Sequence, residues 1–108
     1  MLFYEFTVCD EVYKLRLSTR NIVSLEKSLN CNPLMIFGTD NETLPTVTAM
    51  VAILHASLQQ YQHNISLQDA YDIFDKWLSD NHTLTDFINV IVEIYKVSGL
   101  IKEDSAKN

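Results

Sequence analysis

The spacing of the apolar residues changes near residue 18, and this change restricts the fold more than any other feature. Over residues 2–17 apolar and polar side chains alternate, as in a β-strand with one buried face. Beyond residue 18 apolar residues recur every three or four positions, as on one face of an α-helix. Only two glycines and two prolines interrupt the 108 residues, which favours long helices. We therefore predict a mainly α fold, with an N-terminal β-hairpin packed on a bundle of about four helices.

The predicted hairpin has one apolar face. It consists of Tyr4, Phe6, Val8, Tyr13, Leu15 and Leu17. A turn at Asp10-Glu11 pairs Val8 with Tyr13, which sets Phe6 opposite Leu15 and Tyr4 opposite Leu17. A longer loop at this turn is the alternative. An isolated hairpin is marginally stable in water, so the apolar face is expected to lie against the helices.

Capping residues and helix-stop residues place the helices. Two helices follow the hairpin, one from Ser18 or Thr19 to about Asn30 and one from Pro45 to about Gln60. Between them, Pro33 opens a short turn through Met35, Ile36 and Phe37, and residues 39–42 form a polar loop. Two further helices start at the pairs Ser66 with Asp69 and Thr83 with Asp86, and Gly99 ends the last one. Residues 1–101 are thus expected to form one domain, followed by a polar, mobile tail at 102–108.

Charge and composition narrow the possible partners. The net charge of −6 repels polyanions, so we expect neither nucleic-acid nor membrane binding. The N-terminus lacks the basic and apolar segments of a signal peptide, and no apolar run is long enough to span a membrane. Cys9 and Cys31 lie in different predicted elements without metal-ligand spacing, which indicates reduced thiols. A cytoplasmic location is the prediction.

No pattern in the sequence points to catalysis. The three histidines, His55, His63 and His82, form no HExxH pair, and no glycine-rich phosphate loop is present. Asp72 and Asp75 share a helix face, but a solvated face explains them better than an acid–base pair does. We predict no metal, no cofactor and no enzymatic activity, and interpret the chain as a protein that binds another protein.

The predicted helix that begins at Pro45 is apolar on more than one side, and this breadth has two interpretations. The first is burial of all these sides in the core. The second is a contact surface for amphipathic helices, in which methionine side chains adapt to varied partners. Under the second interpretation the candidate contact residues are Met50, Ile53 and Ser57, together with Met35 and Phe37 of the short turn.

One continuous stretch resembles a known family. It runs Tyr13-Lys14-Leu15-Arg16-Leu17-Ser18-Thr19 and then Asn21-Ile22-Val23-Ser24-Leu25-Glu26-Lys27-Ser28-Leu29-Asn30-Cys31-Asn32-Pro33-Leu34. In this stretch a predicted strand leads into a predicted helix that carries a Leu-Glu-Lys segment. With this order of elements, the stretch resembles the tail assembly chaperones of long-tailed (siphovirus-type) bacteriophages and their prophages. The likeness extends over residues 4–100, although Asn30-Cys31-Asn32 stands where the family has a glycine.

The resemblance implies a function, a set of partners and a location. It implies an assembly chaperone of the host cytoplasm, absent from the mature virion and without a cofactor, that binds the tape-measure protein, keeps it soluble and helps to recruit tail-tube subunits. Self-association into a homo-oligomer stays open, as does a longer, frameshifted form. Two other classes also stay open, namely a small regulator or antitoxin-like protein and a structural tail or connector subunit.

Overall fold

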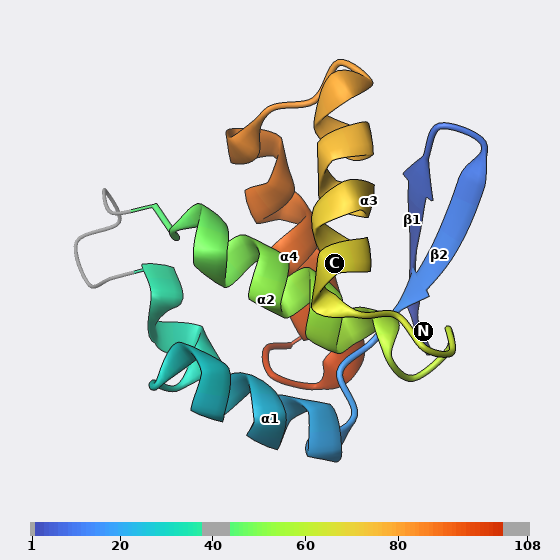
Figure 1. Ribbon diagram of the computed structural model, residues 1–108. Helices are drawn as coiled ribbons and strands as arrows, with labels where there is room; N and C mark the ends of the chain where they lie inside the picture. The colour runs from blue at the N-terminus through green and yellow to red at the C-terminus, as the bar shows by residue number, and fades with distance from the viewer. Residues whose placement is uncertain (1, 38–43, 103–108) are drawn as a thin grey trace, which may run out of the picture.

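A computed structural model describes residues 2–37 and 44–102 of the chain. It contains an N-terminal two-stranded antiparallel hairpin, four α-helices and one short 3-10 helix, so the predicted fold class is confirmed (Figure 1). The elements are β1 (Tyr4–Val8), β2 (Glu11–Leu15), α1 (Thr19–Leu29), η1 (Pro33–Phe37), α2 (Val47–Leu58), α3 (Leu67–Ser79) and α4 (Leu84–Ser98). The predicted polar loop at 39–42, and the predicted tail apart from Lys102, lie outside the described residues.

The register of the hairpin differs from the prediction by two residues. Phe6 pairs with Tyr13, not Leu15, and Val8 pairs with Glu11, because the turn consists of Cys9 and Asp10. Cys9 has a φ of 54°, and a two-residue hairpin turn requires such a positive φ. A shift of two residues keeps every side chain on its predicted face, since the side-chain period of a strand is two. The error therefore changed the pairs but not the apolar face.

The outer edge of β2 is closed by the end of α2 and the turn that follows it. The N–H of Lys14 donates to Oε1 of Gln62 at 2.8 Å, and Nε2 of Gln62 donates to the carbonyl of Lys14 at 3.0 Å. Next to this pair, the N–H of Arg16 donates to the carbonyl of Ser57 at 3.0 Å. The Gln62 amide thus takes the place of a third strand, which fixes the hairpin against the helical layer.

Side-chain caps set the helix boundaries. Thr46 caps α2 by accepting from the N–H of Ala49, so this helix begins two residues after the predicted Pro45. Ser66 and Thr83 form the predicted capping boxes of α3 and α4. Asn30 ends α1 with a φ of 58°, because asparagine tolerates the left-handed conformation usually taken by glycine.

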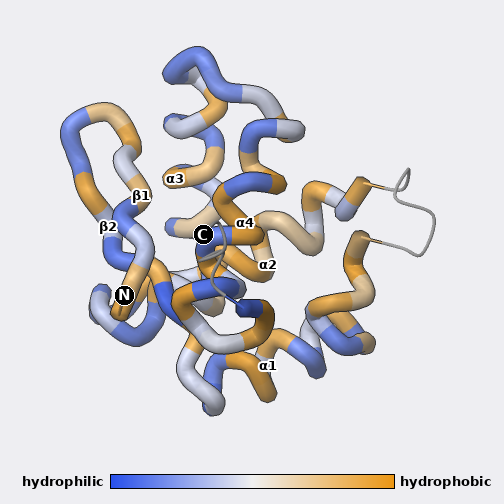
Figure 2. Tube along the Cα trace, turned by 180° about the vertical axis from the view of Figure 1, so that it is seen from behind, coloured by the Kyte–Doolittle hydropathy of each residue, from blue (hydrophilic) through white to orange (hydrophobic). Residues whose placement is uncertain are grey.

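Helix α2 lies at the centre of the core. It packs against α1, α3, α4 and β2, and Figure 1 shows it crossing between the other helices. Eight of its twelve residues are buried, which a surface helix with one apolar stripe does not need. In Figure 2 hydrophobic and hydrophilic residues alternate along the hairpin and the other helices, as expected for elements with one face in water. The predicted burial of α2 on several sides is confirmed.

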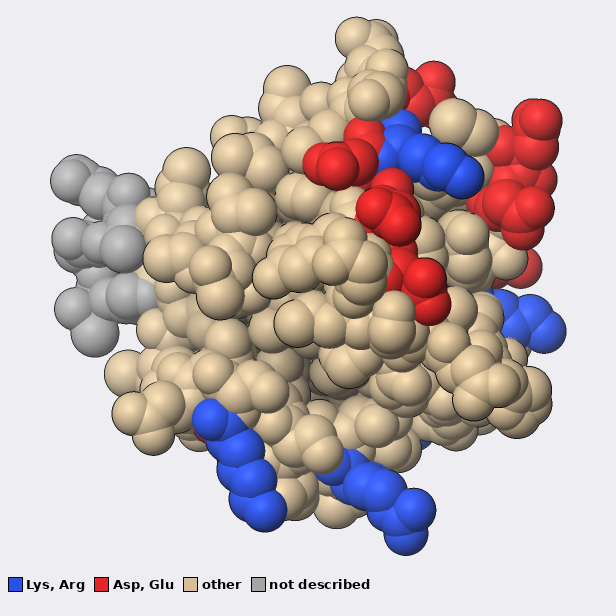
Figure 3. Space-filling model, in the orientation of Figure 1, with Lys and Arg blue, Asp and Glu red and all other residues tan. Residues whose placement is uncertain are grey.

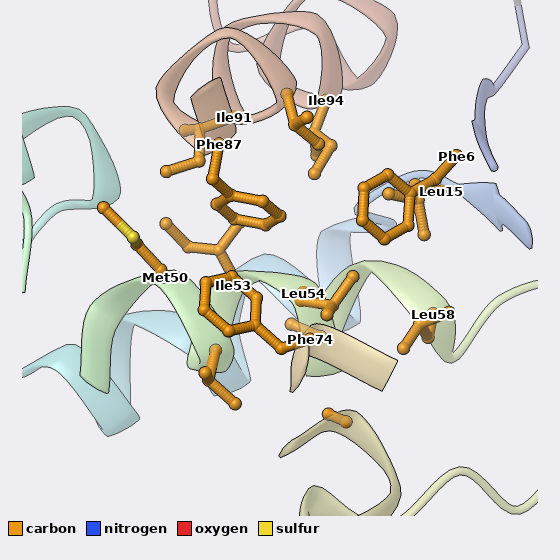
Figure 4. Close-up of a cluster of buried hydrophobic side chains, with 14 of the residues drawn as sticks. Phe6, Leu15, Met50, Ile53, Leu54, Leu58, Phe74, Phe87, Ile91 and Ile94 are labelled. Carbon is orange, nitrogen blue, oxygen red and sulfur yellow. The ribbon is translucent and has the colours of Figure 1, made fainter. Parts of the chain in front are cut away.

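Aromatic side chains join the hairpin to the helices. The ring of Phe6 lies 5.5 Å from Trp77 of α3 and 6.0 Å from Phe87 of α4, measured between ring centroids. Figure 4 shows the Phe6 and Leu15 side chains directed toward those of α2 and α4. Phe6 is 1% exposed, so the predicted docking of the apolar hairpin face is confirmed.

Candidate functional site

A groove of about 500 Å³ opens between α1, α2 and the beginning of α3. It is lined by Asn21, Ser24, Leu25, Ser28, Leu29, Thr48, Val51, Ala52, His55, Ala56, Gln59, Leu67 and Tyr71. The α1 residues form one wall, the α2 residues form the floor, and Leu67 and Tyr71 of α3 form the other wall. Three helices that are separate along the chain therefore contribute to one concave surface.

The middle of the floor consists of small apolar side chains. Ala52 and Ala56 lie one turn apart on α2, and neither side chain extends beyond Cβ. Val51 of α2 and Leu25 of α1, which also line the groove, are almost fully buried. The groove exists because α2 presents alanines where larger side chains would fill the space between α1 and α3.

The rim is polar but carries no formal charge. Ser24 and Ser28 are exposed on α1, and His55 is half-buried on α2. Nε2 of Gln59 is already engaged, donating to the carbonyls of His55 at 2.8 Å and Ile65 at 2.9 Å. Leu67 and Tyr71 are 45% and 43% exposed, so the α3 wall presents apolar area to solvent. This combination suits an apolar ligand surface with a neutral polar border.

The structure places the predicted contact residues elsewhere. Met50, Ile53 and Ser57 are at most 1% exposed, and the Ser57 hydroxyl donates to the carbonyl of Leu54 at 2.9 Å. They belong to the core, so this expectation is corrected: the first interpretation of the apolar helix holds for them. The reason is that β2 of the hairpin and α4 both pack on α2, and the sequence pattern alone did not show which elements would cover this helix.

The other two predicted contact residues lie on η1. Met35 is 55% exposed, whereas Phe37 is half-buried with its ring 6.5 Å from that of Tyr95. The hydroxyl of Tyr95 donates to the carbonyl of Pro33 at 2.9 Å, and burial raises the pKa of this phenol. Neither Met35 nor Phe37 lines the groove.

A repeating pattern in the sequence could have indicated the groove. Asn21, Ser24 and Ser28 follow the helical spacing i, i+3, i+7, so one face of α1 consists of small, neutral polar residues. On α2, Thr48, Ala52 and Gln59 continue the same kind of face. Such a face is too polar for the core and lacks the charged residues usual on a solvated surface. It therefore indicates a binding surface.

Other chemistry-bearing residues have structural explanations. Hydrogen bonds from Ser66 lower the pKa of Asp69, which completes the α3 capping box. Nδ1 of His82 lies 2.8 Å from the carbonyl of Trp77, and its ring stacks on that indole. Cys9 and Cys31 are exposed free thiols. Across residues 2–37 and 44–102, no three His, Cys, Asp or Glu side chains form a group able to hold a metal ion.

Comparison with known proteins places the chain in a family. Residues 5–108 match the model of a family described as "Family of unknown function (DUF6096)". No curated protein and no solved structure matches the chain. Within the described part of the chain, no helix is both long and apolar enough to cross a membrane.

Proposed function

Since this chain belongs to the DUF6096 family, whose function is unknown, we propose a function from its own sequence and surface. It is a tail assembly chaperone of a long-tailed phage or prophage. It binds the tape-measure protein in the host cytoplasm, keeps that protein soluble and helps to recruit tail-tube subunits.

The observation that carries the proposal is the uncharged, mostly apolar groove. Grooves of this kind accept the apolar face of an amphipathic helix. Its floor follows α2, whose twelve residues extend about 18 Å, so the groove accommodates roughly three turns of a bound helix. Tape-measure proteins are long and helical, so they would supply many such segments.

The stretch that resembles the tail chaperones also builds this groove. Ser24, Leu25, Ser28 and Leu29 belong to the resembling segment, and all four line the α1 wall. The sequence likeness and the concave surface thus share the helix α1.

The proposed mechanism is one of mass action. A long helical protein exposes apolar stripes until its tube has assembled, and those stripes promote aggregation. A chaperone that covers them lowers the concentration of the aggregating species and shifts the equilibrium toward soluble protein. No bond is made or broken, so the proposal requires no cofactor.

Co-expression with the tape-measure protein of the same phage tests the proposal. The wild-type chain should raise the soluble fraction of that protein and co-purify with it. Ser28→Tyr places an aromatic ring in the groove and should reduce both effects. Val23→Tyr is the matched control, because Val23 is exposed on α1 but does not line the groove.

Three results would contradict the proposal. The wild-type chain could fail to capture the tape-measure protein or the tube protein. Ser28→Tyr and Val23→Tyr could behave alike, which would exclude the groove as the binding site. The chain could also be found in stoichiometric amount in purified virions, which would identify a structural subunit instead of a chaperone.

A further inference from the structure

We infer that the groove selects its helix by charge as well as by shape. This inference rests on the proposed function and names the partner segment: an amphipathic α-helix whose apolar stripe has acidic residues along one side and basic residues along the other. The α1 wall faces the acidic side of the bound helix, and the α3 wall faces its basic side. The bound helix therefore has one preferred direction.

Basic residues border the groove on α1. Arg20 lies four residues before Ser24, and Lys27 lies three residues after it, so both are neighbours of this lining residue on the helix surface. Both side chains are exposed. In Figure 3, drawn in the orientation of Figure 1, two Lys or Arg side chains lie at the edge formed by α1. The α1 wall thus has a positive outer border.

Acidic residues border the groove on α3. Asp75 lies four residues after the lining residue Tyr71 and is its neighbour on the helix surface. Asp72 lies three residues before Asp75, so it neighbours Asp75 and not a lining residue. Both carboxylates are exposed, and so is Lys76 beside Asp75. Figure 3 shows Asp and Glu side chains along α3 with a Lys or Arg side chain among them, and uncharged atoms between this group and the α1 edge. With two carboxylates against one ammonium group, the α3 wall has a net negative outer border.

Within residues 2–37 and 44–102, no ion pair engages these four charges. The ion pair among the described residues joins Lys96 to Glu93 at 3.6 Å, on α4, and involves none of the four border residues. The lining itself has no formal charge, so burying it against an apolar stripe desolvates no ion. A helix docked in the reverse direction would set like charges against each border, which disfavours that direction.

Three idealised helical peptides of 18 residues test the inference with the intact chain. All share one Leu/Ala stripe; the first has Glu on one side and Lys on the other, the second has Glu on both sides, and the third has Lys on both. Exposed ion pairs contribute modestly, so the mixed peptide should bind roughly fivefold more tightly than either other peptide at low salt. Raising the salt to 1 M should remove this preference.

Charge reversal on α3 should change the preference. In Asp72→Lys with Asp75→Lys both borders are basic, so the peptide with Glu on both sides should bind best. Glu11→Lys with Asp80→Lys changes the net charge by the same amount at exposed positions that do not border the groove, and should leave the order of the three peptides unchanged. A spin label at the N-terminus of the mixed peptide should broaden amide signals at one end of α2 only.

The outcomes separate this inference from the proposed function. Equal binding of the three peptides, or broadening at both ends of α2, overturns the inference but leaves the groove as a helix site. Capture of the tape-measure protein without binding of any peptide also overturns the inference, while the chaperone function stands. If sedimentation shows a dimer that Ser28→Tyr dissociates, the groove binds a second copy of the chain, and the inference is wrong.

Discussion

Replacement of Phe6 by alanine tests how the hairpin is held on the helices. Phe6 is 1% exposed, and its ring contacts those of Trp77 and Phe87. A buried Phe→Ala change costs about 3–5 kcal/mol, from lost transfer free energy and from the cavity that is left. The two aromatic contacts are part of this cost, since each contributes about 0.5–1.5 kcal/mol beyond its buried area.

Such a loss is a large share of the free energy of unfolding of a domain of this size, which is about 5–15 kcal/mol. At roughly 4 °C per kcal/mol, the melting temperature should fall by about 12–20 °C. The chain contains one tryptophan, and Trp77 is in contact with Phe6, so its fluorescence reports hairpin docking while circular dichroism reports the helices.

Val12→Ala is the matched control for this experiment. Val12 lies on the same hairpin but is 55% exposed on its outer face, so its truncation should change stability by less than about 0.5 kcal/mol. If Phe6→Ala melts within about 4 °C of the control, roughly what 1 kcal/mol produces, the hairpin does not contribute to the core as argued. If fluorescence changes at a lower temperature than circular dichroism, the hairpin detaches before the helices unfold.

Two further outcomes follow from burial. Ile53→Asn should unfold the chain or destabilise it by more than about 3 kcal/mol, because Ile53 is fully buried, whereas Val23→Asn on the surface should be nearly neutral. An Ile53→Asn protein that melts at the same temperature as Val23→Asn, followed by circular dichroism, would contradict the core assignment. Burial raises the pKa of Tyr95, so the folded state holds this proton more tightly than the unfolded state does, and stability should decline as the pH rises above about 10. Tyr95→Phe should weaken that alkaline decline but cost about 1–3 kcal/mol at pH 7, because the carbonyl of Pro33 loses its donor; identical alkaline unfolding curves for the two proteins would refute this.

The sequence was most informative where a structural signal is local. The capping boxes at Ser66 and Thr83 and the αL stop at Gly99 involve residues within four positions of each other, so the helix ends could be predicted to within about two residues. The apolar face of the hairpin was also predictable, since strand periodicity depends only on neighbouring residues. The pairing register was not, because it depended on whether Cys9 would adopt a positive φ.

The sequence by itself therefore determined the order and type of the elements, the buried face of each amphipathic one and the absence of a recognisable catalytic motif. Only the tertiary structure decided which sides of α2 are covered. Its apolar residues satisfy both interpretations in sequence. In the structure α1, α3, α4 and β2 all pack on α2, and Met50 and Ile53 are buried in the core. The groove likewise arises from the relative placement of α1, α2 and α3, where the small side chain of Ala52 leaves space that no single helix could reveal.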